Sequence, residues 1–94
     1  MPEVLGAEAV DAALADRSIA WERQDDELVK VVKRKGFAGA LAFVNQVGAL
    51  AEAADHHPDI DIRWDTVTLR LSTHSAGGLT ENDLVLAGQI DALG

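Results

Sequence analysis

The chain has 94 residues, of which 48% are hydrophobic, enough to form a core and too many for a disordered segment. Its formal net charge of −8 disfavours binding to nucleic-acid phosphates, and the absence of cysteine excludes disulfides and thiolate metal ligands or nucleophiles. The start of the chain lacks the features of a secretory signal, and no apolar stretch approaches the ~18 residues of a membrane span. We therefore expect one cytoplasmic domain over residues 1–94, with neither nucleic acid nor membrane as a partner.

The first quarter of the chain predicts a short helix followed by a β-hairpin. Residues 6–16 carry apolar side chains at helical spacing. Residues 19–23 hold a tryptophan between polar neighbours and predict a short strand. The polar run 24–27 is typical of a turn, and residues 28–35, rich in valine, predict the returning strand.

A long helix is expected next, from Phe37 to about Asp55. Its apolar side chains recur at intervals of three and four, which predicts one buried face formed by Phe37, Leu41, Val44, Val47 or Gly48, Ala51 and Ala54. Pro58 cannot continue a helix and biases the residue before it toward an extended backbone. The helix should therefore end near Asp55 or His56.

The last third of the chain predicts a second hairpin and a closing helix. Residues 60–64 and 66–72 alternate between apolar and polar side chains, as strands with one buried face do. Thr80 and Asp83 have the spacing of a capping box that opens a helix. The apolar face of that helix is expected to comprise Leu84, Leu86 or Ala87, Ile90 and Leu93.

The predicted element order is α-β-β-α-β-β-α, an α+β fold in which helices pack on one face of a four-stranded antiparallel sheet. A small sheet that is covered on one side leaves its other face or an edge open to a second copy. We therefore expect a homo-oligomer, either a homodimer or a homotetramer.

The three histidines stand at the two chain segments that flank the second hairpin. His56 and His57 precede its first strand, and His74 follows its second. In an antiparallel hairpin those two points lie at the same open end. Imidazoles gathered there could exchange protons with one substrate near neutral pH, and Asp55 or Asp83 could orient them.

Other interpretations of the histidines are weaker but open. Histidines at a helix-to-strand junction are commonly exposed loop residues. A zinc site needs several ligands converging on one point, whereas adjacent side chains on an extended backbone point apart. We expect no metal site. No serine lies in a nucleophile elbow, which argues against Ser-His-Asp chemistry.

The pattern around the histidines resembles the signature of the pterin-4a-carbinolamine dehydratase family, members of which are also known as dimerisation cofactors of a homeodomain transcription factor. The matching residues are Glu52, His56, His57, Pro58, Trp64, His74 and Asp83. The resemblance is strong over residues 41–93, and the family's element order is the one expected here. Before residue 37 it depends mainly on element order.

The resemblance implies a reaction: dehydration of 4a-hydroxytetrahydropterin to quinonoid dihydropterin, which recycles the pterin of aromatic amino acid hydroxylases. Pterin would be the substrate, with no cofactor required. By position, His56, His57 and His74 would be the catalytic group. We expect His56 and His74 to be the acid–base pair and His57 to bind or polarise the pterin.

The resemblance also implies supporting roles for other residues. Asp83 would orient an imidazole or cap the last helix. Ser72 and Thr73 would offer backbone groups to the amide edge of the pterin. Trp64 would line the pocket or, as we favour, fill the core.

Two other functions are considered. The chain could be a non-catalytic, dehydratase-like binding or assembly module, such as a coactivator or an assembly chaperone, although its motif is complete. A generic ferredoxin-like binding module is a weaker alternative. The basic cluster KVVKRK, Lys30 to Lys35, could be a local anion patch, but we favour the solvated end of a strand.

Overall fold

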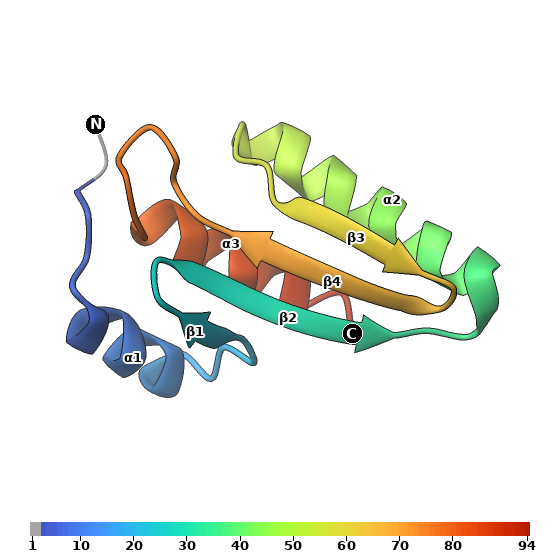
Figure 1. The fold of residues 1–94 in the computed structure, drawn as a ribbon, viewed down its shortest axis with the longest axis horizontal. Coiled ribbons are helices and arrows are strands. Elements are labelled where there is room, and N and C mark those ends of the chain that lie inside the picture. The colour runs from blue at the N-terminus through green and yellow to red at the C-terminus, as the bar shows by residue number, and fades with distance from the viewer. Residues whose placement is uncertain (1–2) are drawn as a thin grey trace.

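The computed structural model describes residues 3–94, which form three helices and one antiparallel sheet of four strands (Figure 1). The strands lie side by side in the order β1-β2-β4-β3. The predicted fold class and element order are confirmed. In chain order the elements are α1 (Ala7–Asp16), β1 (Glu22–Gln24), β2 (Glu27–Lys33), α2 (Gly36–Ala54), β3 (Asp59–Arg63), β4 (Thr66–Leu71) and α3 (Glu81–Asp91).

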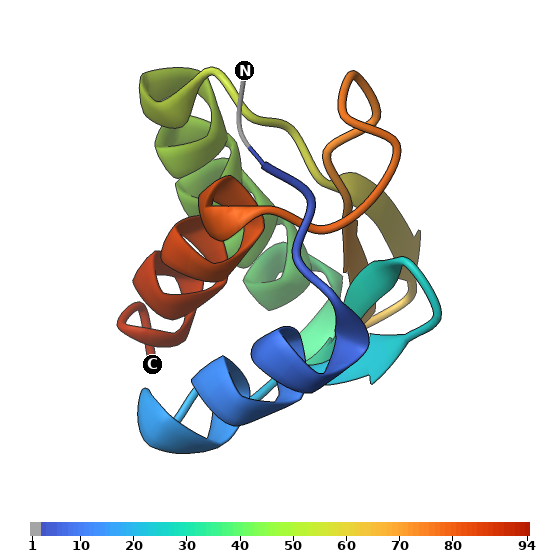
Figure 2. The same cartoon turned by 90° about the vertical axis from the view of Figure 1, so that its left-hand side faces the viewer.

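The helices cover one face of the sheet, and the core lies between the two layers (Figure 2). In β2 and β4, Leu28 lies opposite Leu71 and Val32 opposite Val67, so their side chains share the covered face. These four residues are buried. On the uncovered face Val31 is 64% exposed. The alternation of residues 66–72 therefore predicts the covered face correctly, whereas the apolar side chains of residues 60–64 are not buried as expected, because most of the edge strand β3 is exposed.

The first strand begins later than expected, at Glu22 instead of residue 19. Ile19 and Trp21 are buried but lie outside the sheet. This segment is held by hydrogen bonds to a side chain of α3 and not by pairing with a strand. The carboxylate of Asp91 accepts hydrogen bonds from the Ala20 backbone N–H at 2.7 Å and from Trp21 Nε1 at 2.9 Å.

The buried face of α2 also differs from the expectation. Phe37 is 46% exposed and Leu41 is 40% exposed. The buried residues of α2 are Ala40, Phe43, Val47 and Ala51. Because α2 carries apolar side chains on nearly every side, periodicity alone does not single out the face that packs. By length and composition this 19-residue helix could cross a membrane, contrary to the expectation that no stretch approaches that length.

Trp64 neither fills the core nor lines a pocket with the histidines. Its side chain is 70% exposed, and the residue occupies the tight turn between β3 and β4 with φ = 55°. Its ring stacks on Phe37 with 6.4 Å between centroids. The whole of β3, a span of ~17 Å for five residues, separates Trp64 from the histidine pair.

Candidate active site

The segments that carry the three histidines flank the open end of the β3–β4 hairpin, as the sequence predicts. Figure 1 shows that β3 begins beside the point where β4 ends. The last pair of this ladder joins Asp59 to Arg70. His57 lies two residues before that pair, and His74 lies four residues after it. Strand pairing thus brings together two segments that are distant in sequence.

A left-handed turn at the end of α2 sets the direction of His56. Asp55 adopts φ = 48° and ψ = 43°, and the His56 N–H donates to the Ala51 carbonyl at 3.1 Å. This is the hydrogen-bond pattern of a Schellman helix end. The Asp55 side chain is exposed and makes no hydrogen bond within residues 3–94. Asp55 therefore contributes through its backbone, and the predicted orienting role of its carboxylate is not observed.

Asp83 is fully buried, and both oxygens of its carboxylate are hydrogen-bonded. Oδ1 contacts Nε2 of His56 at 2.5 Å. Oδ2 accepts the Thr80 backbone N–H at 2.9 Å, which closes the predicted capping box at the start of α3. The carboxylate thus forms the helix cap and also bonds to the His56 imidazole. The positive end of the α3 dipole further stabilises this carboxylate.

The bond between His56 and Asp83 determines which nitrogen of the imidazole is free. A carboxylate can only accept, so Nε2 carries the proton and Nδ1 of a neutral ring keeps its lone pair. The His56 side chain is 12% exposed, so its ring is held between protein groups. The arrangement presents one fixed imidazole with an acceptor atom available for a proton.

Thr73 plays a part that the sequence does not reveal. Its hydroxyl donates to Asp83 Oδ2 at 2.7 Å and lies 2.8 Å from the Thr80 hydroxyl. Its backbone N–H and carbonyl bond within the loop of residues 73–78. Thr73 therefore has no free backbone group for a pterin, contrary to expectation. Ser72 is partly buried and makes none of these loop bonds.

The other two histidines face the solvent. His57 Nε2 lies 2.9 Å from Glu52 Oε1, back along the last turn of α2, and both side chains are exposed. The His56 ring thus bonds to a residue of α3, whereas the His57 ring bonds to a residue of α2. Adjacent side chains on an extended backbone are expected to point apart in this way. His74 is exposed and makes no side-chain hydrogen bond within the described residues. It follows Thr73 directly, so the Asp83 carboxylate links the segments of His56 and His74.

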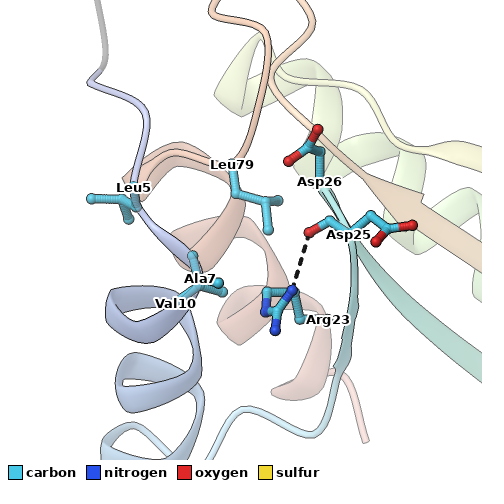
Figure 3. A pocket seen from close by; sticks show the side chains of 7 residues that line it. All are labelled: Leu5, Ala7, Val10, Arg23, Asp25, Asp26 and Leu79. Atoms are coloured by element: carbon cyan, nitrogen blue, oxygen red, sulfur yellow. Dashed lines mark hydrogen bonds between the residues drawn. The ribbon is translucent and has the colours of Figure 1, made fainter.

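A cavity of about 510 Å³ opens beside α1, and none of the predicted site residues lines it (Figure 3). Arg23, on its wall, donates to Asp11 at 2.7 Å, and this hydrogen bond holds the pKa of Asp11 below its usual range. The lining residues are Leu5, Ala7, Val10, Arg23, Asp25, Asp26 and Leu79. The cavity is therefore distinct from the group formed by His56, Asp83 and Thr73.

Comparison with known proteins decides the family. The family profile described as pterin 4 alpha carbinolamine dehydratase matches residues 3–93. The chain belongs to this family. It is 53% identical to a protein of Nocardia farcinica with the provisional name pterin-4-alpha-carbinolamine dehydratase, over 97% of this chain and 95% of the relative. A Roseiflexus castenholzii protein with the same provisional name is 50% identical over 99% of each chain.

Two solved structures of dehydratase-like proteins share the fold. A transcriptional coactivator/pterin dehydratase from Brucella melitensis superposes with a TM-score of 0.88 at 30% identity, covering 97% of this chain and 98% of that one. A pterin dehydratase-like protein, described as a RuBisCO assembly factor in the alpha-carboxysome, gives 0.62 at 26% identity, covering 78% and 84%. The fold thus also occurs in proteins whose descriptions name roles other than dehydration.

Proposed function

We propose that the protein is a hydro-lyase that dehydrates 4a-hydroxytetrahydropterin to quinonoid dihydropterin and so recycles the pterin of aromatic amino acid hydroxylases. Membership of the dehydratase family supports this assignment. The observation that carries it is the bond from His56 to the buried Asp83, at the hairpin end that also holds His74. An imidazole fixed by a carboxylate is a recurrent device for moving protons.

The reaction needs one proton donor and one proton acceptor. The donor protonates the 4a-hydroxyl, the C4a–O bond breaks, and water departs. The electron pair of a ring nitrogen forms the new C=N bond, and the acceptor takes the proton of that nitrogen. Atoms and charge balance without an oxidant or a covalent intermediate. The pterin is thus the substrate, and the proposed step uses no resident cofactor.

We assign the acceptor role to His56 and the donor role to His74. In its neutral form His56 offers Nδ1, and Asp83 behind Nε2 stabilises the imidazolium that forms. His74 is exposed and makes no side-chain hydrogen bond to any residue from 3 to 94, so a substrate can reach its ring. We assign pterin binding to His57, whose ring is held by Glu52.

A non-catalytic binding or assembly role is the alternative, because neighbours in fold are described as a coactivator and an assembly factor. Such a role does not need a buried carboxylate directed at an imidazole. The cap of α3 and the bond to Thr73 use only Oδ2 of Asp83, whereas Oδ1 is left to hold the His56 ring. The intact pair of His56 and Asp83 therefore favours the enzyme.

The direct test follows the absorbance decay of carbinolamine generated by a phenylalanine hydroxylase, with and without the purified protein. We expect acceleration in proportion to protein concentration. A decay rate that is unchanged by the protein would leave the binding module as the better account. A heat-denatured sample serves as the control for buffer catalysis.

A further inference from the structure

The N-terminal segment, residues 3–6, lies against the loop that connects β4 to α3. The Leu5 N–H donates to the Leu79 carbonyl at 2.8 Å, and Figure 3 shows both residues beside the cavity next to α1. One residue earlier, Cγ1 of Val4 lies 3.0 Å from the position that a Cβ atom on Gly78 would occupy. A backbone hydrogen bond and an apolar contact therefore join the two segments at adjacent positions.

These contacts reach the candidate active site through Thr73. The Thr73 N–H donates to the Gly78 carbonyl at 3.0 Å, and the two residues form an isolated antiparallel bridge. The Thr73 hydroxyl in turn donates to Asp83, whose other oxygen bonds to His56. Each step from Val4 to the His56 imidazole is therefore a direct contact, and a contiguous path of this kind can carry coupling between two parts of a protein.

The position of His74 depends on the closed loop and not on contacts of its own side chain. Its imidazole is exposed and makes no side-chain hydrogen bond to any residue from 3 to 94. Within the loop, the Gly77 N–H donates to the carbonyl of Thr73 at 3.0 Å and to that of His74 at 3.1 Å. The bridge between Thr73 and Gly78 closes this turn. Opening of that bridge would therefore displace the His74 ring.

Little other packing holds the N-terminal segment in place. Val4 is 47% exposed. Both Leu5 and Leu79 line the cavity of about 510 Å³, so protein atoms do not fill the space on that side of the segment. Segments with few buried contacts open locally far more often than the core of a protein does. The N-terminal segment can therefore detach without unfolding of the sheet.

We propose that Val4 and Leu5 are positioning residues of the candidate active site, which keep the turn of residues 73–78 closed and so hold His74 beside the substrate. Detachment of the segment would open this turn and withdraw the His74 ring, whereas Asp83 remains fixed by the cap of α3. The proposal rests on the proposed function for the role of His74, whereas the closure of the turn is measurable without any activity.

The hydrogen bond is tested by comparing Leu5→Pro with Leu5→Ala. Both variants lose the leucine side chain, but only proline lacks the N–H that donates to Leu79. In Leu5→Pro we expect the amide hydrogen of Thr73, followed by NMR, to exchange about tenfold faster than in Leu5→Ala. Amide hydrogens of the β2–β4 ladder should exchange at equal rates in the two variants, because the opening is local.

The apolar contact is tested by two substitutions that compensate each other. The Cβ of Gly78→Ala would lie 3.0 Å from Val4 Cγ1, closer than ordinary van der Waals contact, and should displace the segment. Val4→Ala removes both γ-methyl groups and leaves its Cβ 4.0 Å away, so the double variant should regain the wild-type exchange rate at Thr73. Gly88→Ala is the control, since a Cβ at Gly88 would meet nothing within 4 Å beyond its own helix.

The dehydration kinetics separate positioning from stability. Because the proposed role of His74 is in the transition state, detachment should lower kcat about tenfold in Leu5→Pro and Gly78→Ala, with KM changed less than about twofold. The double variant Val4→Ala/Gly78→Ala and the Gly88→Ala control should keep kcat within about twofold of wild type. A general loss of stability would not be reversed by the removal of two further methyl groups.

Three results would overturn the proposal. One is equal exchange of the Thr73 amide in Leu5→Pro and Leu5→Ala. Another is equally faster exchange throughout the β2–β4 ladder, which would show general destabilisation. The third is a wild-type kcat in variants whose Thr73 amide exchanges faster. If the wild-type protein does not dehydrate carbinolamine, the proposed function fails, and the exchange rates alone decide whether the segment holds the turn closed.

Discussion

At the scale of single residues, the carboxylate of Asp83 has two roles. Oδ2 caps α3 and accepts the Thr73 hydroxyl, while Oδ1 fixes the ring of His56. Because the side chain is fully buried, each oxygen is directed by protein donors instead of water. The orientation of the imidazole is therefore coupled to the start of α3.

Replacing Asp83 by asparagine should lower the rate of carbinolamine dehydration by about 10²-fold, because an amide cannot stabilise the imidazolium. Rates are compared in the hydroxylase-coupled assay. Asp91→Asn is the matched control, since Asp91 holds Trp21 and Lys30 at the far end of α3. We expect that control to lose stability and to keep its rate. Equal rate losses in both variants would contradict a specific role for Asp83.

The backbone of Asp55 gives a second prediction. With φ = 48°, this residue occupies the left-handed region, where a branched side chain costs about 1–2 kcal/mol. Asp55→Val should lower the free energy of unfolding by about that amount, whereas Asp55→Gly should leave it unchanged or raise it. Urea denaturation measures both. A rate of dehydration in Asp55→Gly that is far below wild type would restore a role for the Asp55 carboxylate.

Elements could be predicted from the sequence where one local signal dominates. Thr80 and Asp83 have the spacing of a capping box, and the structure shows that box at the start of α3. The prediction of the buried face of α2 is wrong in part, because this helix carries apolar side chains on most sides. Only tertiary packing determines that Ala40 and Phe43 are buried and Phe37 is not. The hydroxyl bond from Thr73 to Asp83 was missed, since no spacing rule relates residues on a loop and on a helix.

At the scale of secondary-structure elements, the N-terminal cap of α3 leads to a stability prediction. Thr80→Ala should lower the free energy of unfolding by about 1–2 kcal/mol, because Asn82 N–H loses its acceptor and the Thr73 hydroxyl loses a partner. Thr80→Ser, which keeps the hydroxyl, is the control and should stay within about 0.5 kcal/mol of wild type. Chemical denaturation gives both values. Identical losses in the two variants would show that the methyl group, not the hydroxyl, matters.

The whole molecule has one sheet face and one helix that are incompletely covered. Val31 is exposed on the open sheet face, and α2 is apolar although few of its residues are buried. We propose that these surfaces support a homodimer or homotetramer. Light scattering coupled to gel filtration should give two or four times the chain mass of 10.0 kDa. A mass of one chain at micromolar concentration would refute this assembly.

The account depends most on the idea that His56 and His74 act on the same substrate from two segments joined through Asp83. The most direct measurement is the dehydration rate of His56→Gln, His74→Gln and the double variant under single-turnover conditions. The dehydration rate of each single variant should fall about 10²-fold or more. The rate of the double variant should fall by much less than the product of the two single losses, because the two histidines act in one transition state. Single variants with wild-type rates, or fully multiplicative losses, would contradict the account.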